Sequence, residues 1–171
     1  MDGRLLKLTV LSAFVAVGVV ISPILRIEGM CPTAHLVNVT CAVLLGPYYA
    51  FGCAAAIGII RMTLMGIPPL ALTGAVFGAL LSGALYRISG KKLVFAVLGE
   101  ILGTGVVGSL ASYPVMTYLW GRNGLTLFFY TPMFFGASVM GGSVAYILLK
   151  VVSANGALDA LQARLNGAEG R

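Results

Sequence analysis

The chain has 171 residues, of which 59% are hydrophobic and 9% are charged, with a mean hydropathy of +1.00 and a net charge of +6. Because soluble domains carry about 25% charged residues, this composition excludes an ordinary soluble protein and predicts an integral membrane protein. No basic patch is interleaved with aromatic residues, so the positive charge does not predict binding to nucleic acid.

Six apolar runs follow one another along the chain, and a helix needs about 20 mostly apolar residues to cross a bilayer. We therefore predict an all-α bundle of six transmembrane helices. Their residues are 5–24, 35–45, 48–62, 70–86, 93–119 and 126–152. The second and third runs are short and meet at Gly46-Pro47, a helix-breaking pair, so these two runs can equally form one interrupted helix.

An even number of spans places both termini on the same side of the membrane, and the basic residues indicate which side. One flank of the predicted helices carries Arg4, Lys7, Arg87, Lys91, Lys92, Lys150, Arg164 and Arg171, whereas the other carries Arg26, Arg61 and Arg122. The positive-inside rule then predicts that both termini are cytoplasmic.

The segment after the last predicted span differs from the rest because polar residues interrupt it. Leu158, Leu161 and Leu165 recur there at helical spacing. This pattern is typical of a short amphipathic helix that lies on the inner leaflet. We therefore divide the chain into a six-helix transmembrane domain, residues 1–152, in which we expect any binding site to lie, and a cytoplasmic tail, residues 153–171.

Polar side chains gather in what this topology makes the outer half of the bilayer. His35 and Asn38, in the stretch PTAHLVN, share one face of the second helix, since residues three apart are neighbours. We interpret His35 as a ligand contact or as a residue at a wet helix end, and Arg61 as a ligand contact or as a side chain that snorkels to the interface. The candidate substrate-binding residues are His35, Asn38, Arg61, Thr73, Glu100, Tyr113, Tyr130 and Ser138, with Phe134 and Phe135 as further aromatic contacts.

Glu100 lies about two turns inside the fifth predicted helix, where a carboxyl group must be buried, paired or protonated. We place it with Thr104 in the inner half of the bilayer, at a depth that does not match Arg61. Gly99 and Gly103 form a G-x-x-x-G pattern, which predicts close helix packing. His35 has no carboxylate partner near it in the sequence, so acid–base catalysis is a poor hypothesis.

The sequence also lacks the common motifs for nucleotide, metal and nucleophile chemistry. It has no G-x-x-x-x-G-K-[ST], H-E-x-x-H, C-x-x-C or G-x-S-x-G. Cys31, Cys41 and Cys53 do not have the spacing of a metal cluster or of a disulfide framework. We therefore expect no enzyme activity, metal or cofactor in this chain, and a small-molecule binder that takes its energy from a partner fits better.

Four stretches together resemble a known family. They are PTAHLVNVTCAVLLGPYYA, FGALLSGALYR, LGEILGTGVVGSLASYP and FFYTPMFFGASVMGGSVAYIL, in matching order within residues 5–150. The chain resembles ThiW, the substrate-binding S component of an energy-coupling factor (ECF) transporter for the thiazole half of thiamin. The resemblance implies a six-helix bundle that binds hydroxyethylthiazole near the outer face. It also implies two kinds of partner, a membrane-embedded coupling subunit and two ATP-binding-cassette ATPases that use the ATP.

The resemblance further implies a docking face for the coupling subunit on the first helix, where Thr9, Ser12, Ala13 and Ala16 are spaced by three and four. Ala34 departs from the family pattern, which more often has glutamine there, so another vitamin-like heterocycle stays open as the ligand. Two further alternatives are a stand-alone secondary carrier, which tends to show inverted repeats, and a small membrane enzyme, which needs paired carboxylates or a metal site.

Overall fold

The computed structural model describes residues 3–24 and 30–167, and this part of the chain is helical without any β-strand. Its helices are α1 (Gly3–Ile21), α2 (Pro32–Leu45), α3 (Pro47–Met65), α4 (Leu70–Ile88), α5 (Leu93–Leu102), η1 (Gly103–Gly108), α6 (Ser109–Pro114), η2 (Val115–Leu119), α7 (Thr131–Ala154) and α8 (Ala157–Gly167). The four elements from α5 to η2 form one long helix, in which η1 and η2 are π-helical segments.

Five helices are long and apolar enough to cross a membrane, which agrees with a multi-pass membrane protein. They are Gly3–Ile21, Pro47–Met65, Leu70–Ile88, Leu93–Leu119 and Thr131–Ala154. The remaining apolar helix, α2, has 14 residues, a length of about 21 Å at 1.5 Å per residue, whereas the hydrocarbon core is about 30 Å thick. Six membrane spans therefore stay a prediction.

The break between α2 and α3 separates two helices that the sequence allowed to be one. Gly46 adopts φ 94° and ψ 176°, a conformation that favours glycine, and Pro47 occupies the first turn of α3, where its missing N–H is tolerated. The last predicted span begins later than expected, at Thr131 in place of residue 126, with Pro132 in its first turn. Proline again marks the start of the helix.

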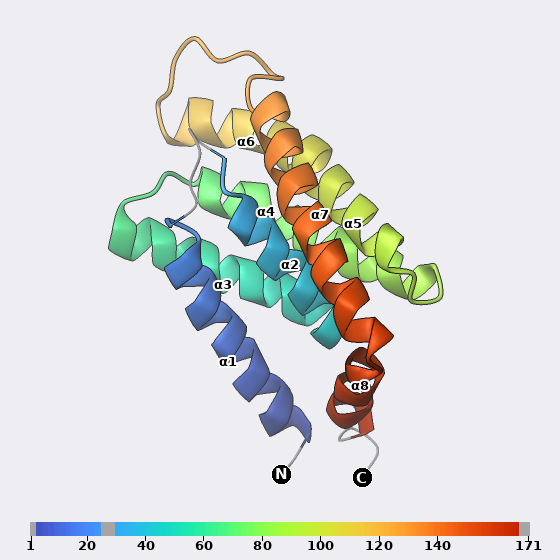
Figure 1. Cartoon of the computed structure of the whole chain (residues 1–171). Coiled ribbons are helices and arrows are strands. Elements are labelled where there is room, and N and C mark those ends of the chain that lie inside the picture. Colours follow the sequence, from blue (N-terminus) through green and yellow to red (C-terminus); the bar gives the residue numbers. More distant parts are fainter. Residues whose placement is uncertain (1–2, 25–29, 168–171) are drawn as a thin grey trace.

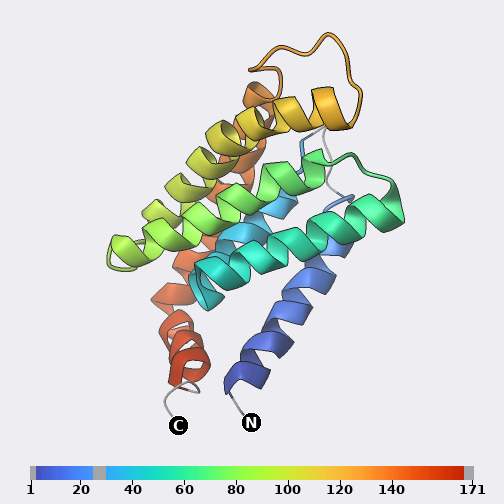
Figure 2. The same cartoon turned by 180° about the vertical axis from the view of Figure 1, so that it is seen from behind.

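Both termini lie at one end of the bundle, and the connection between η2 and α7 arches over the opposite end (Figures 1 and 2). This arrangement agrees with termini on one side of a membrane. Which side that is stays a prediction. The centre of the bundle is α4, which packs against α2, α3 and the α5–η1 helix.

Glycines allow α4 and the α5–η1 helix to touch along their backbones. A Cβ atom built on Gly99 would lie 2.4 Å from the Leu81 carbonyl oxygen, and one built on Gly103 would lie 2.5 Å from the Phe77 carbonyl oxygen. The G-x-x-x-G pattern is therefore a helix-packing motif, as predicted. The close contact brings the buried side chain of Glu100, which lies between the two glycines, against α4.

The tail forms the predicted helix as α8, but its apolar face contacts the bundle. Leu158 and Leu165 are buried, whereas Leu161 is exposed. The Gln162 side-chain amide donates hydrogen bonds to the Val43 carbonyl oxygen (2.9 Å) and to the Tyr86 hydroxyl (3.0 Å). Carbonyl groups in the last turn of a helix lack partners within it, so Gln162 caps the end of α2. The expectation that this apolar face rests on a lipid leaflet is therefore wrong for Leu158 and Leu165.

Candidate functional site

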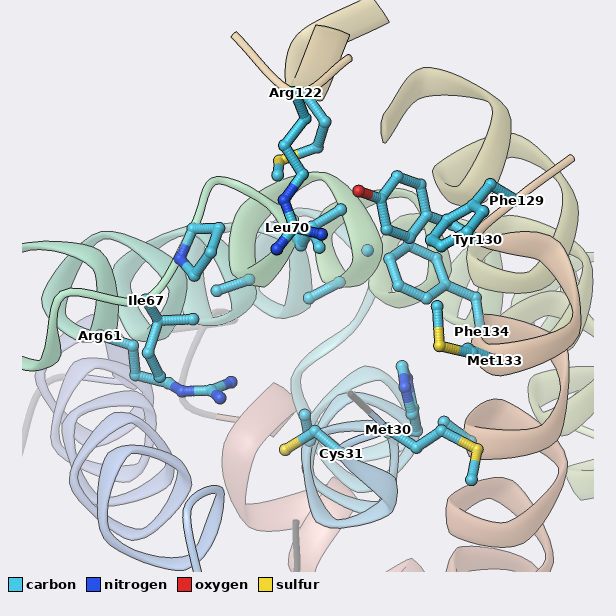
Figure 3. A pocket seen from close by; sticks show the side chains of 18 residues that line it. Met30, Cys31, Arg61, Ile67, Leu70, Arg122, Phe129, Tyr130, Met133 and Phe134 are labelled. Carbon is cyan, nitrogen blue, oxygen red and sulfur yellow. The ribbon is translucent and has the colours of Figure 1, made fainter. Parts of the chain in front are cut away.

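A cavity of about 360 Å³ lies at the end of the bundle opposite the termini (Figure 3). Its walls come from the start of α2, the end of α3, the connection to α4, the start of α4, and the segments on both sides of the η2–α7 connection. Ligand pockets typically have about 300–1,000 Å³ and mostly apolar walls with a few polar groups. The cavity therefore has the size of a site for a small molecule.

The wall is mostly apolar, with sulfur and aromatic side chains both beside and opposite the start of α2 (Figure 3). Met30, Met116, Met133 and Phe134 contribute much of this surface, and such side chains provide contact area for a flat heterocycle. The polar groups are few and lie apart from one another, which suits a role in orienting a ligand. They come from His35, Arg61, Arg122, Tyr130 and Cys31.

Arg61 is the charged group deepest in this site. It is 5% exposed, and its Nε has no hydrogen-bond partner in the described part of the chain. Its guanidinium points from α3 into the cavity (Figure 3). An arginine at membrane depth costs about 2.5–3.5 kcal/mol, and the burial of Arg61 within protein does not fit a side chain that snorkels to a lipid interface. Within the described part of the chain, no side chain bonds the Nε of this group, and the guanidinium faces the cavity.

Tyr130 contributes a second polar atom that lacks a partner. The ring is 2% exposed, and its hydroxyl has no hydrogen-bond partner among the described residues. In Figure 3 this hydroxyl is directed towards the space between Tyr130 and Arg122. Edge-on contact with Phe129, at 5.1 Å between ring centroids, fixes one side of the ring. The hydroxyl is thus held ready to bond a ligand.

Behind the cavity, three donors converge on one carboxylate oxygen, and we call these four residues the Glu100 cluster. His35 Nδ1 lies 2.7 Å from Glu100 Oε1, Asn38 Nδ2 donates to the same oxygen over 3.0 Å, and Thr104 Oγ1 donates over 3.1 Å. Asn38 Nδ2 also donates to the Ala75 carbonyl oxygen at 3.0 Å. All four cluster residues are buried. These hydrogen bonds offset part of the cost of burying polar groups, and Glu100 Oε2 is buried without a partner among the described residues.

The Glu100 cluster sets the tautomer of His35. Glu100 Oε1 already accepts from an amide and a hydroxyl, so the histidine nitrogen that faces it carries the hydrogen and donates. Nε2 is then the ring nitrogen left for a ligand, because His35 also lines the cavity. His35 therefore links the cavity to a buried carboxylate.

This pairing corrects two expectations from the sequence. His35 does have a carboxylate partner, and Glu100 and Thr104 do not lie apart from the outer polar residues but bond directly to the α2 pair. The reason is that α2 is short and begins inside the bundle. Gly141 lets α2 approach α7, since a Cβ atom there would lie 2.8 Å from the Cβ of His35.

A second glycine makes room for the cluster on the other side. A Cβ atom built on Gly78 would lie 2.1 Å from Thr104 Oγ1 and 2.7 Å from Glu100 Oε1. Glycine is therefore the residue that allows α4 to pass this close to the hydrogen-bonded carboxylate.

The other predicted site residues occupy different places. Tyr130 and Phe134 line the cavity together with His35 and Arg61, whereas Asn38 and Glu100 lie behind it. Thr73 and Ser112 bond each other at 2.6 Å, and the Ser138 hydroxyl donates to the carbonyl oxygen of Phe135. Tyr113 does not line the cavity, and Phe135 is exposed on the outside of α7. Thr73 thus connects α4 to α6, whereas the Ser138 hydroxyl bonds within its own helix.

Sequence reasoning missed Arg122, the three methionines and Ala34 as lining residues. For Arg122 a signal was present, because it belongs to the flank that the positive-inside rule leaves poor in basic residues. Ala34, at which the resemblance leads us to expect glutamine, lines the cavity with a small side chain. The methionines follow no spacing that separates them from ordinary apolar residues.

The residues expected to dock a coupling subunit lie on the outer surface of α1. Thr9, Ser12, Ala13 and Ala16 are exposed, and the Thr9 and Ser12 hydroxyls donate to carbonyl oxygens of their own helix. Ser12 and Ala16 also line a shallow apolar groove between α1 and Ile60 of α3. The face is smooth, apolar and free of unmet donors, as a close helix contact in a membrane requires.

Comparison with protein families gives one match. A family described as thiamine-precursor transporter protein (ThiW) matches residues 8–155, a range that contains every residue of the cavity and of the Glu100 cluster. No curated protein and no solved structure is significantly similar to the chain. In the described residues, no group of three or more His, Cys, Asp or Glu side chains could hold a metal ion.

Proposed function

The chain belongs to the ThiW family of thiamine-precursor transporters, and we propose that it is the substrate-binding subunit of an ECF importer that binds hydroxyethylthiazole or a related thiazole. A transporter of this family is a multi-pass protein of the cell membrane, in agreement with its five long apolar helices. In this proposal the cavity faces the cell exterior, and both termini are cytoplasmic.

The cavity is the observation that carries the proposal. It combines apolar and aromatic walls with a histidine whose free nitrogen is oriented by a buried carboxylate. Hydroxyethylthiazole has a flat ring for the apolar walls and a hydroxyl that can donate to His35 Nε2. The buried Tyr130 hydroxyl can donate in turn to the ring nitrogen.

Uptake by this chain would require partner proteins that supply energy. A binding subunit without a nucleotide motif needs an energy source, which we assign to a membrane-embedded coupling subunit and two ATP-binding-cassette ATPases. The exposed small residues of α1 support a docking site for that subunit. In this scheme the chain itself has no cofactor and catalyses no reaction.

A different vitamin-like heterocycle is the second candidate ligand, and Ala34 favours it. This small residue lines the cavity at a position where the resemblance implies glutamine, so the chain lacks an amide that could select one ring. Calorimetric titration of the purified full chain in nanodiscs, with hydroxyethylthiazole, hydroxymethylpyrimidine and thiamin, tests the choice. We expect the thiazole to bind most tightly, and saturation by the pyrimidine alone would contradict the thiazole assignment.

A further inference from the structure

The cavity holds more positive charge than a neutral thiazole needs. Arg61 and Arg122 both line it, and no aspartate or glutamate does among the described residues. Their guanidinium groups enter the cavity from different sides, Arg61 from α3 and Arg122 from the segment after η2 (Figure 3). We propose that the site selects an anionic ligand, a heterocycle carrying a phosphate monoester or a carboxylate that Arg61 and Arg122 bind. This inference rests on the proposed function and narrows its substrate class.

Arg61 carries the first step of the argument. A charged group that is buried without a partner is strongly unfavourable, and buried charges in proteins are normally paired. Arg61 is 5% exposed, with an Nε that bonds nothing in the described chain. Arginine presents a planar fork of donors that matches phosphate and carboxylate geometry. An oxyanion in the cavity would therefore supply what this guanidinium lacks.

Among the described residues, Glu100 is the buried acidic residue closest to the cavity lining, and it does not provide this compensation. Glu100 lies behind the wall, and its Oε1 is already the acceptor for His35, Asn38 and Thr104. Oε1 is thus committed to the cluster, whereas Oε2 is buried without a hydrogen-bond partner among the described residues, and neither oxygen forms a hydrogen bond or ion pair with Arg61 in the described part of the chain. The two arginines give the cavity lining a positive charge that no aspartate or glutamate in the described wall opposes.

Arg122 completes the site at its mouth. Arg122 is exposed. Its backbone N–H donates to the Met116 carbonyl oxygen at 2.9 Å, and this bond anchors the backbone of Arg122 beside the cavity. An exposed cation at the entrance attracts anions from solution and speeds their capture. In this arrangement an anionic ligand meets the exposed Arg122 first and then binds the buried Arg61, where water is excluded.

The test measures ligand preference with the full chain in nanodiscs. Equilibrium dissociation constants are determined for hydroxyethylthiazole, its phosphate monoester, a methylthiazole carboxylate, phenyl phosphate and inorganic phosphate. We expect at least one of the two thiazole anions to bind about tenfold or more tightly than the neutral alcohol, as hydrogen bonds to charged groups allow. The two anions distinguish a phosphate from a carboxylate as the preferred group.

Variants then assign the preference to the arginines. Arg61→Gln should reduce the ratio of anion to alcohol affinity to within about twofold of unity, and Arg61→Lys should retain only part of it because lysine lacks the planar fork. Arg122→Gln should lower the association rate of the anion and its dependence on salt. Arg164→Gln, an exposed arginine of α8 at the other end of the bundle, is the matched control and should leave the ratio unchanged.

The outcomes separate this inference from the proposed function. If the neutral alcohol binds as tightly as both thiazole anions, the inference is overturned while the thiazole assignment stands. If phenyl phosphate binds through Arg61 but no thiazole binds, the anion site is supported and the thiazole assignment fails. If Arg61→Gln does not fold, the Arg61→Lys and Arg122→Gln ratios decide, and an unchanged preference in both overturns the inference.

Discussion

At the scale of single residues, His35 has two roles that depend on different ring nitrogens. Nδ1 holds the Glu100 cluster together, and Nε2 is free for a ligand. The sequence indicated that His35 and Asn38 share a face, and the structure confirms it, because both bond Glu100. The carboxylate itself was not predictable as the partner, since 65 residues separate it from His35 and helix depth was judged from apolar runs alone.

Substitutions at His35 separate the two roles. Asparagine places an amide N–H near the position of Nδ1, so His35→Asn should keep the bond to Glu100 and the folded stability but lose the ligand contact. We expect its affinity for hydroxyethylthiazole to fall by about 1–3 kcal/mol, measured by calorimetric titration. His35→Ala should lose both stability and affinity. Unchanged affinity in His35→Asn would remove Nε2 from the binding site, and Thr40→Val, another polar residue of α2, is the control.

A substitution at Gly78 tests how tightly the Glu100 cluster packs against α4. Gly78→Ala forces a methyl group to within 2.1 Å of Thr104 Oγ1, so we expect a loss of about 1–3 kcal/mol of stability from overpacking. Gly52→Ala is the matched control, because a Cβ atom there meets nothing within 4 Å. Thermal unfolding of both variants in one detergent measures the difference. Equal midpoints would show that the Glu100 cluster is not packed tightly against α4.

At the scale of helices, apolar runs and proline positions were sufficient to locate the elements. The runs predicted each of the five described helices that are long and apolar enough to cross a membrane, and Pro47 and the G-x-x-x-G of α5–η1 behaved as expected. The contacts of α8 were not predictable, because leucines at helical spacing suit a lipid surface and a protein surface equally. The π-helical segments η1 and η2 within Leu93–Leu119 also follow from no local signal that we identified.

Gln162 tests whether α8 is part of the bundle. Gln162→Leu leaves the Val43 carbonyl and the Tyr86 hydroxyl without this donor, so we expect about 1–3 kcal/mol of lost stability. Ligand affinity should not change, because the cavity lies at the other end of the molecule. Arg164→Gln, exposed on the same helix, controls for a change in helix polarity. A Gln162→Leu variant that unfolds at the wild-type temperature would show that the cap contributes nothing.

At the scale of the whole molecule, the cavity and the α1 face lie on different parts of the surface, so binding and coupling can be altered separately. Ala13→Trp and Ala16→Trp add bulk to the exposed face of α1 and should abolish co-purification with the proposed coupling subunit while ligand affinity stays unchanged. Ile147→Trp, at an exposed position of α7, is the control for a lipid-facing tryptophan. Normal co-purification of both α1 variants would place the docking site elsewhere.

The claim that the cavity between α2, α3, α4 and α7 is the ligand site is tested most directly by filling it. Ala71 lines the cavity, whereas Ala84 lies further along α4, is equally half-buried and does not line it. Calorimetric titration of Ala71→Phe and Ala84→Phe with the tightest-binding thiazole compares the two positions. We predict that Ala71→Phe abolishes measurable binding and that Ala84→Phe binds within about twofold of the wild type. Wild-type affinity in a folded Ala71→Phe variant would contradict the assignment of this cavity.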